Sequence, residues 1–255
     1  MFITHDGAQL FTVSFGRHER TLLALGGWAG SWELWVEPFA ELSQTWRTVA
    51  YDHRGAGATI APTESITIDT MVDDVFAVMD AMGIDKCVLA AESAGASIAI
   101  LAALRKPERI SGLILVDGMY YVPDSTGLER FNARLKNDFS GGVGSFVESC
   151  LTTADGDEFR RWGQQILMRS TPEAAIQLNV CMKNMDLRTA VKGITHRTLI
   201  MHGDADAIIP LKASEWLAKE MPNSKLQIIK GAGHVPTITH PHIVAEAIDR
   251  YFVAS

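Results

Sequence analysis

Polar side chains of the three types needed for nucleophilic catalysis each follow a short apolar run. Ser93 comes directly after CVLAAE, Asp204 and Asp206 follow TLIMHG, and His234 follows LQIIKGAG. A serine hydroxyl is a poor nucleophile at neutral pH, so an imidazole must accept its proton and a carboxylate must hold the tautomer and orientation of that imidazole. These residue types predict a serine nucleophile, provided that the fold brings the ends of the apolar runs together.

Ser93 also has a purely structural interpretation. It lies at the junction between an expected strand and an expected helix, and serine is a favoured helix N-cap. Taken alone, the residue would be interpreted as a cap. The later aspartates and His234, which also follow strand-like runs, favour the nucleophile instead.

The elements that must position these residues alternate along the chain. Short apolar runs indicate strands, and apolar residues three and four apart indicate helices. Expected strands, with the turns that end them, span 9–15, 20–27, 46–57, 86–92, 110–118, 196–210 and 225–234; expected helices span 31–44, 68–83, 94–105, 211–221 and 241–253. This alternation predicts a mainly parallel sheet with helices on both faces. The loops after parallel strands gather along one edge, where ligands bind.

The alternation is interrupted between about residues 120 and 190, where no strand-like run occurs. Helices are expected near 126–138, 142–153, 156–169 and 172–190. A block of helices inserted into a strand–helix pattern predicts a separate layer. We therefore expect a core built from residues 1–119 and 191–255, and a helical cap, or lid, built from residues 120–190.

Composition excludes several classes of function. The 255 residues are 47% hydrophobic and carry a formal charge of -7 without a basic stripe, which argues against a nucleic-acid surface. The three cysteines have no paired spacing, and the N-terminus lacks a signal-peptide pattern, so we expect a cytoplasmic protein. No apolar stretch approaches the ~20 residues that span a bilayer. No metal-site spacing and no dinucleotide fingerprint occurs, so no cofactor is expected.

With these elements in place, the chain resembles the α/β-hydrolase superfamily over nearly its whole length. AESAG resembles the nucleophile elbow G-x-S-x-G, with Ala91 in place of the first glycine, and the order Ser, Asp, His is that of this fold. HGDADAIIP resembles the acid loop, GAGHVP the histidine loop, LGGWAGSW the oxyanion loop, and DHRGAGAT a turn that shapes the fold and carries no chemistry. The resemblance implies a mostly parallel eight-stranded sheet with helices on both faces and an inserted helical cap.

The resemblance also implies a catalytic triad of Ser93, Asp206 and His234. In the family the acid commonly stands four residues before the proline of its loop, which selects Asp206 over Asp204. Asp204 is then expected to cap or brace the loop. Asp117, which ends the preceding strand, remains an alternative acid because some relatives use that place.

The family pattern places an oxyanion hole at the backbone N–H groups of Trp28 and Ala94, with Gly27 as an alternative to Trp28. Candidate substrate-pocket residues are Gly27, Trp28, Glu92, Met119 and Tyr120. Glu92 has two open interpretations: a side chain bonded into the scaffold beneath the elbow, or a charge that tunes His234 or selects substrate. The remaining histidines, His53 and His202 among them, are assigned no role.

The expected activity is that of a cofactor-independent serine hydrolase acting on an ester or lactone of a small or medium apolar substrate through an acyl-enzyme. The chain is similar to small esterases and lactonases. It is also similar to the stress-regulating hydrolases and their karrikin and strigolactone receptor relatives. A ligand sensor acting through a protein partner is therefore one alternative, and a C–C bond hydrolase is another.

Overall fold

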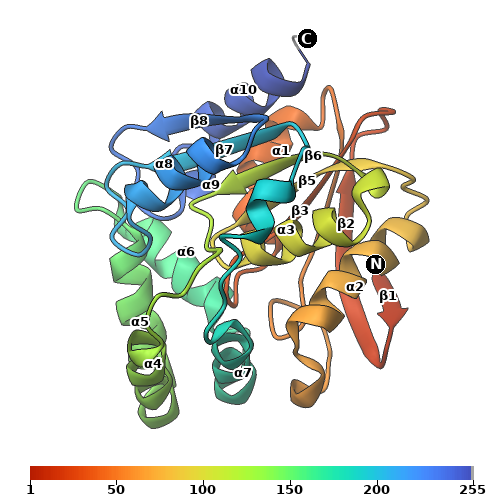
Figure 1. The fold of residues 1–255 in the computed structure, drawn as a ribbon. Coiled ribbons are helices and arrows are strands. Elements are labelled where there is room, and N and C mark those ends of the chain that lie inside the picture. Colours follow the sequence, from red (N-terminus) through yellow and green to blue (C-terminus); the bar gives the residue numbers. More distant parts are fainter. Residues whose placement is uncertain (254–255) are drawn as a thin grey trace.

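The structure is a computed structural model that describes residues 1–253. At its centre lies one eight-stranded sheet with the order β1-β2-β4-β3-β5-β6-β7-β8 (Figure 1). The strands are β1 (Phe2–His5), β2 (Ala8–Phe15), β3 (Thr21–Leu25), β4 (Arg47–Tyr51), β5 (Cys87–Glu92), β6 (Ile110–Val116), β7 (Thr198–Gly203) and β8 (Ser224–Ile229). The pairs β1–β2 and β2–β4 are antiparallel, and all other neighbouring pairs are parallel. The predicted mostly parallel sheet is confirmed.

Strand burial follows position in the sheet. Every residue of β3, β5 and β7 is buried, because helices cover both faces of these strands, and their sequences are correspondingly apolar throughout. The edge strand β8 is only partly buried. At the other edge, β1 and β2 form a hairpin whose turn residues Asp6 and Gly7 have φ of 41° and 72°, the conformation that a two-residue hairpin turn favours.

Helices lie on both faces of the sheet (Figure 1). The helix α1 packs against α9 and α10, while α2 packs against α3. Their bounds are α1 (Val36–Leu42), α2 (Ile68–Ala81), α3 (Gly95–Arg105), α8 (Leu211–Glu220), α9 (Pro236–Thr239) and α10 (Pro241–Phe252); short 3₁₀ turns are η1 (Trp32–Trp35), η2 (Thr63–Ser65), η3 (Pro107–Arg109) and η4 (Ala190–Gly193). Across residues 1–253, no helix combines the length and apolarity needed to cross a bilayer.

Four further helices lie between β6 and β7 in the chain, and we call them the four-helix block. They are α4 (Thr126–Asn137), α5 (Phe139–Cys150), α6 (Asp157–Leu167) and α7 (Pro172–Met182). Figure 1 shows them grouped at one edge of the sheet, in green and teal. All four fall within residues 120–190, and the division of the chain into a core and a cap at these boundaries stays a prediction.

The helix expected over 172–190 was too long. In the structure α7 ends at Met182, and Asn184 adopts a left-handed φ of 61° that a helix cannot continue through. The chain then returns to the sheet side through a bridge between Tyr121 and Asp186. Hydrophobic periodicity alone missed this stop, because the residues after Met182 include no glycine before Gly193.

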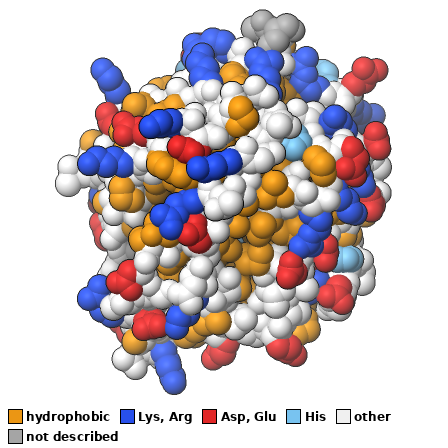
Figure 2. All heavy atoms as spheres, in the orientation of Figure 1, with side chains coloured by type: hydrophobic (Ala, Val, Ile, Leu, Met, Phe, Trp, Pro, Cys, Tyr) orange, Lys and Arg blue, Asp and Glu red, His pale blue; other side chains and the backbone are white. Residues whose placement is uncertain are grey.

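Charged side chains are distributed over the surface. Figure 2 shows acidic and basic groups interspersed on this face, with no continuous basic stripe. The distribution agrees with the acidic net charge of -7.

Candidate active site

Ser93 occupies a sharp turn between β5 and α3. Its φ is 49°, a left-handed value that is strained for a residue other than glycine, and its N–H donates to the carbonyl of Val116 at 2.9 Å. The following helix comes very close to the loop after β3: a Cβ added at Gly95 would lie 2.4 Å from the carbonyl oxygen of Gly26. The strand and helix meet tightly enough to require glycine, and the turn holds Ser93 in a fixed orientation.

His234 connects the serine to one carboxylate. Its Nε2 lies 2.8 Å from Oγ of Ser93, and its Nδ1 lies 2.7 Å from Oδ2 of Asp206. The backbone N–H of His234 donates to the carbonyl of Cys150, at the end of α5, at 2.7 Å. The imidazole is buried, with 2% of the residue exposed. The loops after β5, β7 and β8 thus bring together three residues that lie far apart in sequence.

Asp206 is held as an ionised partner for this imidazole. Its Oδ1 accepts hydrogen bonds from the N–H groups of Ile208 and Ile209 at 2.7 and 3.0 Å. Burial opposes ionisation, but the hydrogen bond and charge of His234, together with the two amides, outweigh it and hold the pKa of Asp206 below its usual value.

The two other candidate acids have different surroundings. Asp117 is buried, its Oδ1 accepts from the N–H of Gly203 at 2.9 Å, and its Oδ2 has no hydrogen-bond partner among the described residues. Burial, followed by the charge of Asp206, raises the pKa of Asp117 well above its usual value. Asp204 accepts from the N–H of Gly231 at 2.7 Å and braces the loop after β8. Of the three, only Asp206 is hydrogen-bonded to His234 within residues 1–253.

The loop after β3 passes directly beside the serine. A Cβ at Gly27 would lie 2.8 Å from Cβ of Ser93 and 3.5 Å from its Oγ. Neither the backbone N–H of Trp28 nor that of Ala94 has a hydrogen-bond acceptor within the described part of the chain. Two unpaired backbone donors on the loops that flank a serine hydroxyl can bind the oxygen of a carbonyl group.

Glu92 is buried beside this arrangement, with 1% of the residue exposed. Its Oε1 accepts one long hydrogen bond, 3.4 Å from Oγ1 of Thr237, and its Oε2 has no partner among the described residues. Burial raises the pKa of Glu92 to about 8; the bond from Thr237 lowers it and the charge of Asp206 raises it further. A pKa of about 8 favours the neutral carboxyl group at neutral pH, and both interpretations of Glu92 stay predictions.

Two cavities meet at Ser93. The first encloses about 570 Å³ of space, part of it open to solvent, and is lined by His234, Glu92 and apolar side chains of α5 and α6. The second contains about 630 Å³, also partly open to solvent, and is lined by Ala94, Met119 and apolar side chains of α3, α4 and α7. Both are lined by Gly27, Trp28, Ser93 and Phe146. A substrate with two apolar parts on either side of its reacting carbon would fit such a site.

The predicted pocket residues are distributed unevenly around these cavities. Gly27 and Trp28 line both, Glu92 lines the first, and Met119 lines the second. Trp28 also anchors the four-helix block, since its indole N–H donates to the carbonyl of Ala175 at 2.9 Å. Tyr120 lines neither cavity: its hydroxyl donates to the carbonyl of Ala213 and its ring stacks on that of Trp216.

Two histidines without a predicted role contact the site. His53 lines the second cavity, and its Nε2 lies 2.9 Å from the carbonyl oxygen of Gly27. His202 bonds through Nδ1 to Oγ of Ser214 at 2.8 Å, and its Nε2 lies 3.5 Å from Oδ2 of Asp206. Burial lowers the pKa of His202, which favours its neutral form. The sequence signal for His53 was its place in the turn after a strand.

A mostly parallel eight-stranded sheet that carries serine, aspartate and histidine in this order after its strands defines an α/β-hydrolase. The sequence model of the family described as serine aminopeptidase, S33, matches residues 17–238. The chain belongs to this family and is an α/β-hydrolase enzyme, as its sequence motifs predicted.

Known relatives resemble the chain over most of its length. It is 28% identical to a putative carbamate hydrolase, RutD, of Caulobacter vibrioides, over 89% of this chain and 88% of that protein. It is 26% identical to a pimeloyl-[acyl-carrier protein] methyl ester esterase of Nitrosomonas europaea, over 89% of this chain and 94% of that protein.

Solved structures share the fold. An esterase from Exiguobacterium antarcticum superposes with a TM-score of 0.92 at 22% identity, over 98% of each chain. An enol-lactonase from Burkholderia xenovorans superposes with a TM-score of 0.90 at 18% identity, over 96% of this chain and 97% of that chain.

Proposed function

We propose that this chain is a cofactor-independent serine hydrolase that cleaves an ester or lactone of a small or medium apolar substrate. The observation that carries the proposal is the continuous chain of hydrogen bonds from Ser93 through His234 to Asp206, at 2.8 and 2.7 Å. Ser93, at the end of this chain, lines two largely apolar cavities. Two relatives are named as a methyl ester esterase and a putative carbamate hydrolase, and both of these activities are acyl-transfer reactions of the same type.

In the first half of the reaction, Oγ of Ser93 attacks the carbonyl carbon while its proton passes to Nε2 of His234. The carbonyl electrons move to oxygen, and the N–H groups of Trp28 and Ala94 stabilise the resulting anion. Asp206 accepts the Nδ1–H bond of the imidazolium and keeps it oriented. When the tetrahedral adduct collapses, the proton on Nε2 moves to the leaving alcohol, and an acyl-enzyme remains on Ser93.

In the second half, water takes the place of the alcohol. His234 removes a proton from the water as the water oxygen attacks the acyl carbon. The imidazolium then gives this proton to Oγ of Ser93 when the acid leaves. The site of proton delivery also orients the substrate. The leaving oxygen must approach Nε2 of His234, which lines only the first cavity. We assign the alcohol part to the first cavity and the acyl part to the second.

Labelling with a fluorophosphonate tests the nucleophile. The probe should modify Ser93 in the wild-type protein and leave Ser93→Ala unmodified and inactive on a simple aryl ester. The matched control is Ser149→Ala, because Ser149 is exposed on α5 and its hydroxyl bonds, among the described residues, only to the carbonyl of Ser145. Labelling at a different serine, or turnover by Ser93→Ala, would contradict the proposal.

The number of turnovers separates this proposal from the sensor alternative. A hydrolase should release many equivalents of product from each molecule of protein. A single slow event per molecule, accompanied by a shift in melting temperature, would favour a ligand sensor that signals through a protein partner.

A further inference from the structure

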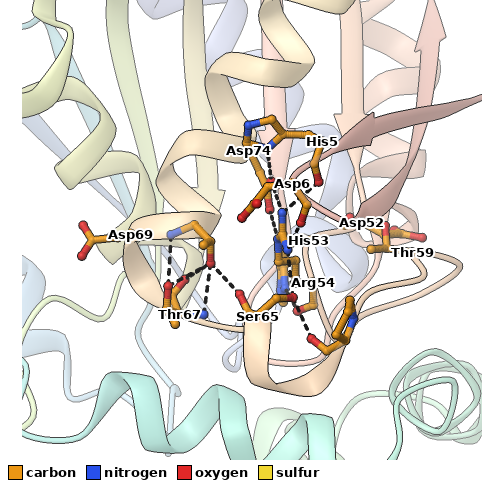
Figure 3. A network of polar contacts seen from close by, with 12 residues as sticks. His5, Asp6, Asp52, His53, Arg54, Thr59, Ser65, Thr67, Asp69 and Asp74 are labelled. Atoms are coloured by element: carbon orange, nitrogen blue, oxygen red, sulfur yellow. Dashed lines mark hydrogen bonds and ion pairs between the residues drawn. The ribbon is translucent and has the colours of Figure 1, made fainter.

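The turn after β4 is fixed to the rest of the fold by the side chain of Arg54. This guanidinium is fully buried and bonds to both carboxylate oxygens of Asp74, at 2.7 and 3.0 Å. It also donates to the carbonyls of His5 and Asp6 and to the hydroxyl of Ser65 (Figure 3). A buried, bidentate arginine with all of these acceptors leaves the turn little freedom to move.

From this fixed turn, two neighbouring side chains reach the loop after β3. Oδ1 of Asp52 accepts the backbone N–H of Trp32 at 2.7 Å. Nε2 of His53 lies 2.9 Å from the carbonyl oxygen of Gly27, which also accepts the N–H of Gly30 at 3.1 Å. Both side chains are buried. The loop that carries the proposed oxyanion donor is thus bonded at both of its ends to residues 52 and 53.

The carbonyl of Gly27 and the N–H of Trp28 belong to one peptide bond. None of the described peptide bonds is cis, so this C=O and this N–H point in opposite directions. The strand order β4-β3-β5 places the loop after β3 between the turn of His53 on one side and that of Ser93 on the other. A carbonyl held toward His53 therefore directs the Trp28 N–H toward the side of Ser93.

We propose that His53 is a positioning residue that aims the Trp28 N–H into the oxyanion hole by donating a hydrogen bond from Nε2 to the Gly27 carbonyl. The inference rests on the proposed hydrolase function, because it concerns where the substrate's carbonyl oxygen binds. It extends that function by assigning a task to a turn that sequence analysis had left without chemistry.

The proposal sets a condition on the proton of His53. Nδ1 lies 2.9 Å from the carbonyl oxygen of Arg54, so both ring nitrogens face backbone carbonyls, which only accept hydrogen bonds. A neutral imidazole carries one N–H and can serve one of them, whereas the imidazolium serves both. In either case the mechanism requires a proton on Nε2.

Two amide substitutions separate the bonds of the two ring nitrogens. The side-chain NH₂ of glutamine in His53→Gln reaches the position of Nε2, whereas that of asparagine in His53→Asn reaches only the position of Nδ1. We expect His53→Gln to stay within about threefold of the wild-type kcat, since it keeps a donor for Gly27. We expect His53→Asn to lose about 10- to 100-fold in kcat with little change in KM, somewhat less than the loss of a whole oxyanion donor.

Two further readouts distinguish positioning from a general loss of structure. Affinity for an alkyl boronic acid, whose tetrahedral adduct places an oxygen in the oxyanion hole, should fall in His53→Asn and not in His53→Gln. Affinity for the product carboxylate should be similar in both. The ¹H–¹⁵N resonance of Trp28 should shift in His53→Asn alone. Equal boronate affinities in the two variants, or an unmoved Trp28 resonance, would overturn the inference.

The wild-type protein supplies an independent test if His53→Asn does not fold. The ¹⁵N shift of His53 should show a protonated Nε2, and an unprotonated Nε2 would overturn the inference without any variant. The Trp28 and His53 resonances do not depend on turnover. If Ser93→Ala keeps its activity, the proposed function fails while these two measurements still report on the orientation of the peptide bond.

Discussion

Nδ1 of His234 lies 2.7 Å from Oδ2 of Asp206, while Asp117, which has a carboxylate oxygen within 4.8 Å of both residues, accepts its hydrogen bond from the N–H of Gly203. The two acids are therefore not equivalent. Asp206 has the contacts of a group that fixes the imidazole, and its pKa is lowered. Asp117 has a raised pKa because of burial and the nearby charge of Asp206.

This difference predicts the effect of removing each charge. Asp206→Asn should lower kcat by about 10⁴, because an amide at this position favours the wrong imidazole tautomer. Asp117→Asn should cost far less, since the Asp117 carboxylate bonds to the N–H of Gly203 and, among the described residues, has no hydrogen bond to His234. Asp204→Asn serves as the control on the same loop, because the carboxylate of Asp204 accepts from the N–H of Gly231 and, among the described residues, has no hydrogen bond to His234. Steady-state kinetics on an aryl ester would measure all three variants. If Asp206→Asn were active and Asp117→Asn inactive, the acid of the triad would be Asp117 and not Asp206.

The close approach of Ser93, Asp206 and His234 in the fold could be predicted from the sequence, because it depends on few local signals. Ser93, Asp206 and His234 lie on the loops that follow three strands, and parallel strands place the residues after them at one edge. The choice between Asp206 and Asp117 was harder. Both follow strands that are neighbours in the sheet, so only the side-chain contacts distinguish them.

Other parts of the site were not predictable, because they depend on contacts between distant segments. The sequence signal for His53, its place in the turn after a strand, does not indicate which residue it contacts; its contact with Gly27 exists because β4 and β3 are adjacent in the sheet. Tyr120 was expected in the pocket from its place after β6, but it turns away to stack on Trp216. In the four-helix block, the same apolar periodicity serves both helix packing and cavity lining.

Gly27 should tolerate no side chain. An added Cβ would meet Cβ of Ser93 at 2.8 Å and the carbonyl of Glu92 at 3.3 Å, so either the loop or the nucleophile must move. Gly27→Ala should lower kcat by about 10²-fold, as expected when an oxyanion donor is displaced. The matched control is Gly127→Ala on α4, where nothing lies within 4 Å of the added atom and activity should be retained. Equal activity in the two variants would show that the loop accommodates the methyl group without effect.

Filling the cavities one at a time should separate the two parts of the substrate. Leu167 lines only the first cavity and Met182 only the second. Leu167→Trp should lower kcat/KM for esters with long alcohol chains by about tenfold, and Met182→Trp should do the same for long acyl chains, because each removes space from one side of the reacting carbon. Acetate esters of long alcohols and methyl esters of long acids, matched in chain length, provide the comparison. If Leu167→Trp instead impaired the long acyl chains and Met182→Trp the long alcohol chains, the assignment of the two cavities would be reversed.

The buried carboxyl of Glu92 should make stability depend on pH. Its pKa is about 8 in the folded protein, chiefly because of burial, against a usual value of 4.5. The folded state therefore holds the proton more tightly than the unfolded state. The stability that this provides is fully present below about pH 4.5, decreases as pH rises because only the unfolded state ionises, and is lost once pH passes about 8.

Glu92→Gln removes this proton linkage while keeping the shape of the side chain. Relative to wild type, the variant should gain about 3 kcal/mol in free energy of unfolding between about pH 5 and pH 8, with the gain accumulating across that window. Denaturant unfolding at several pH values measures it. Asp117, Asp206 and Cys150 also face this region, but to first order their titration cancels in the difference between the two proteins. Glu108→Gln, an exposed substitution of the same type, controls for the change of side chain itself. A stability difference between Glu92→Gln and wild type that stays constant with pH would mean that Glu92 is ionised in the folded protein.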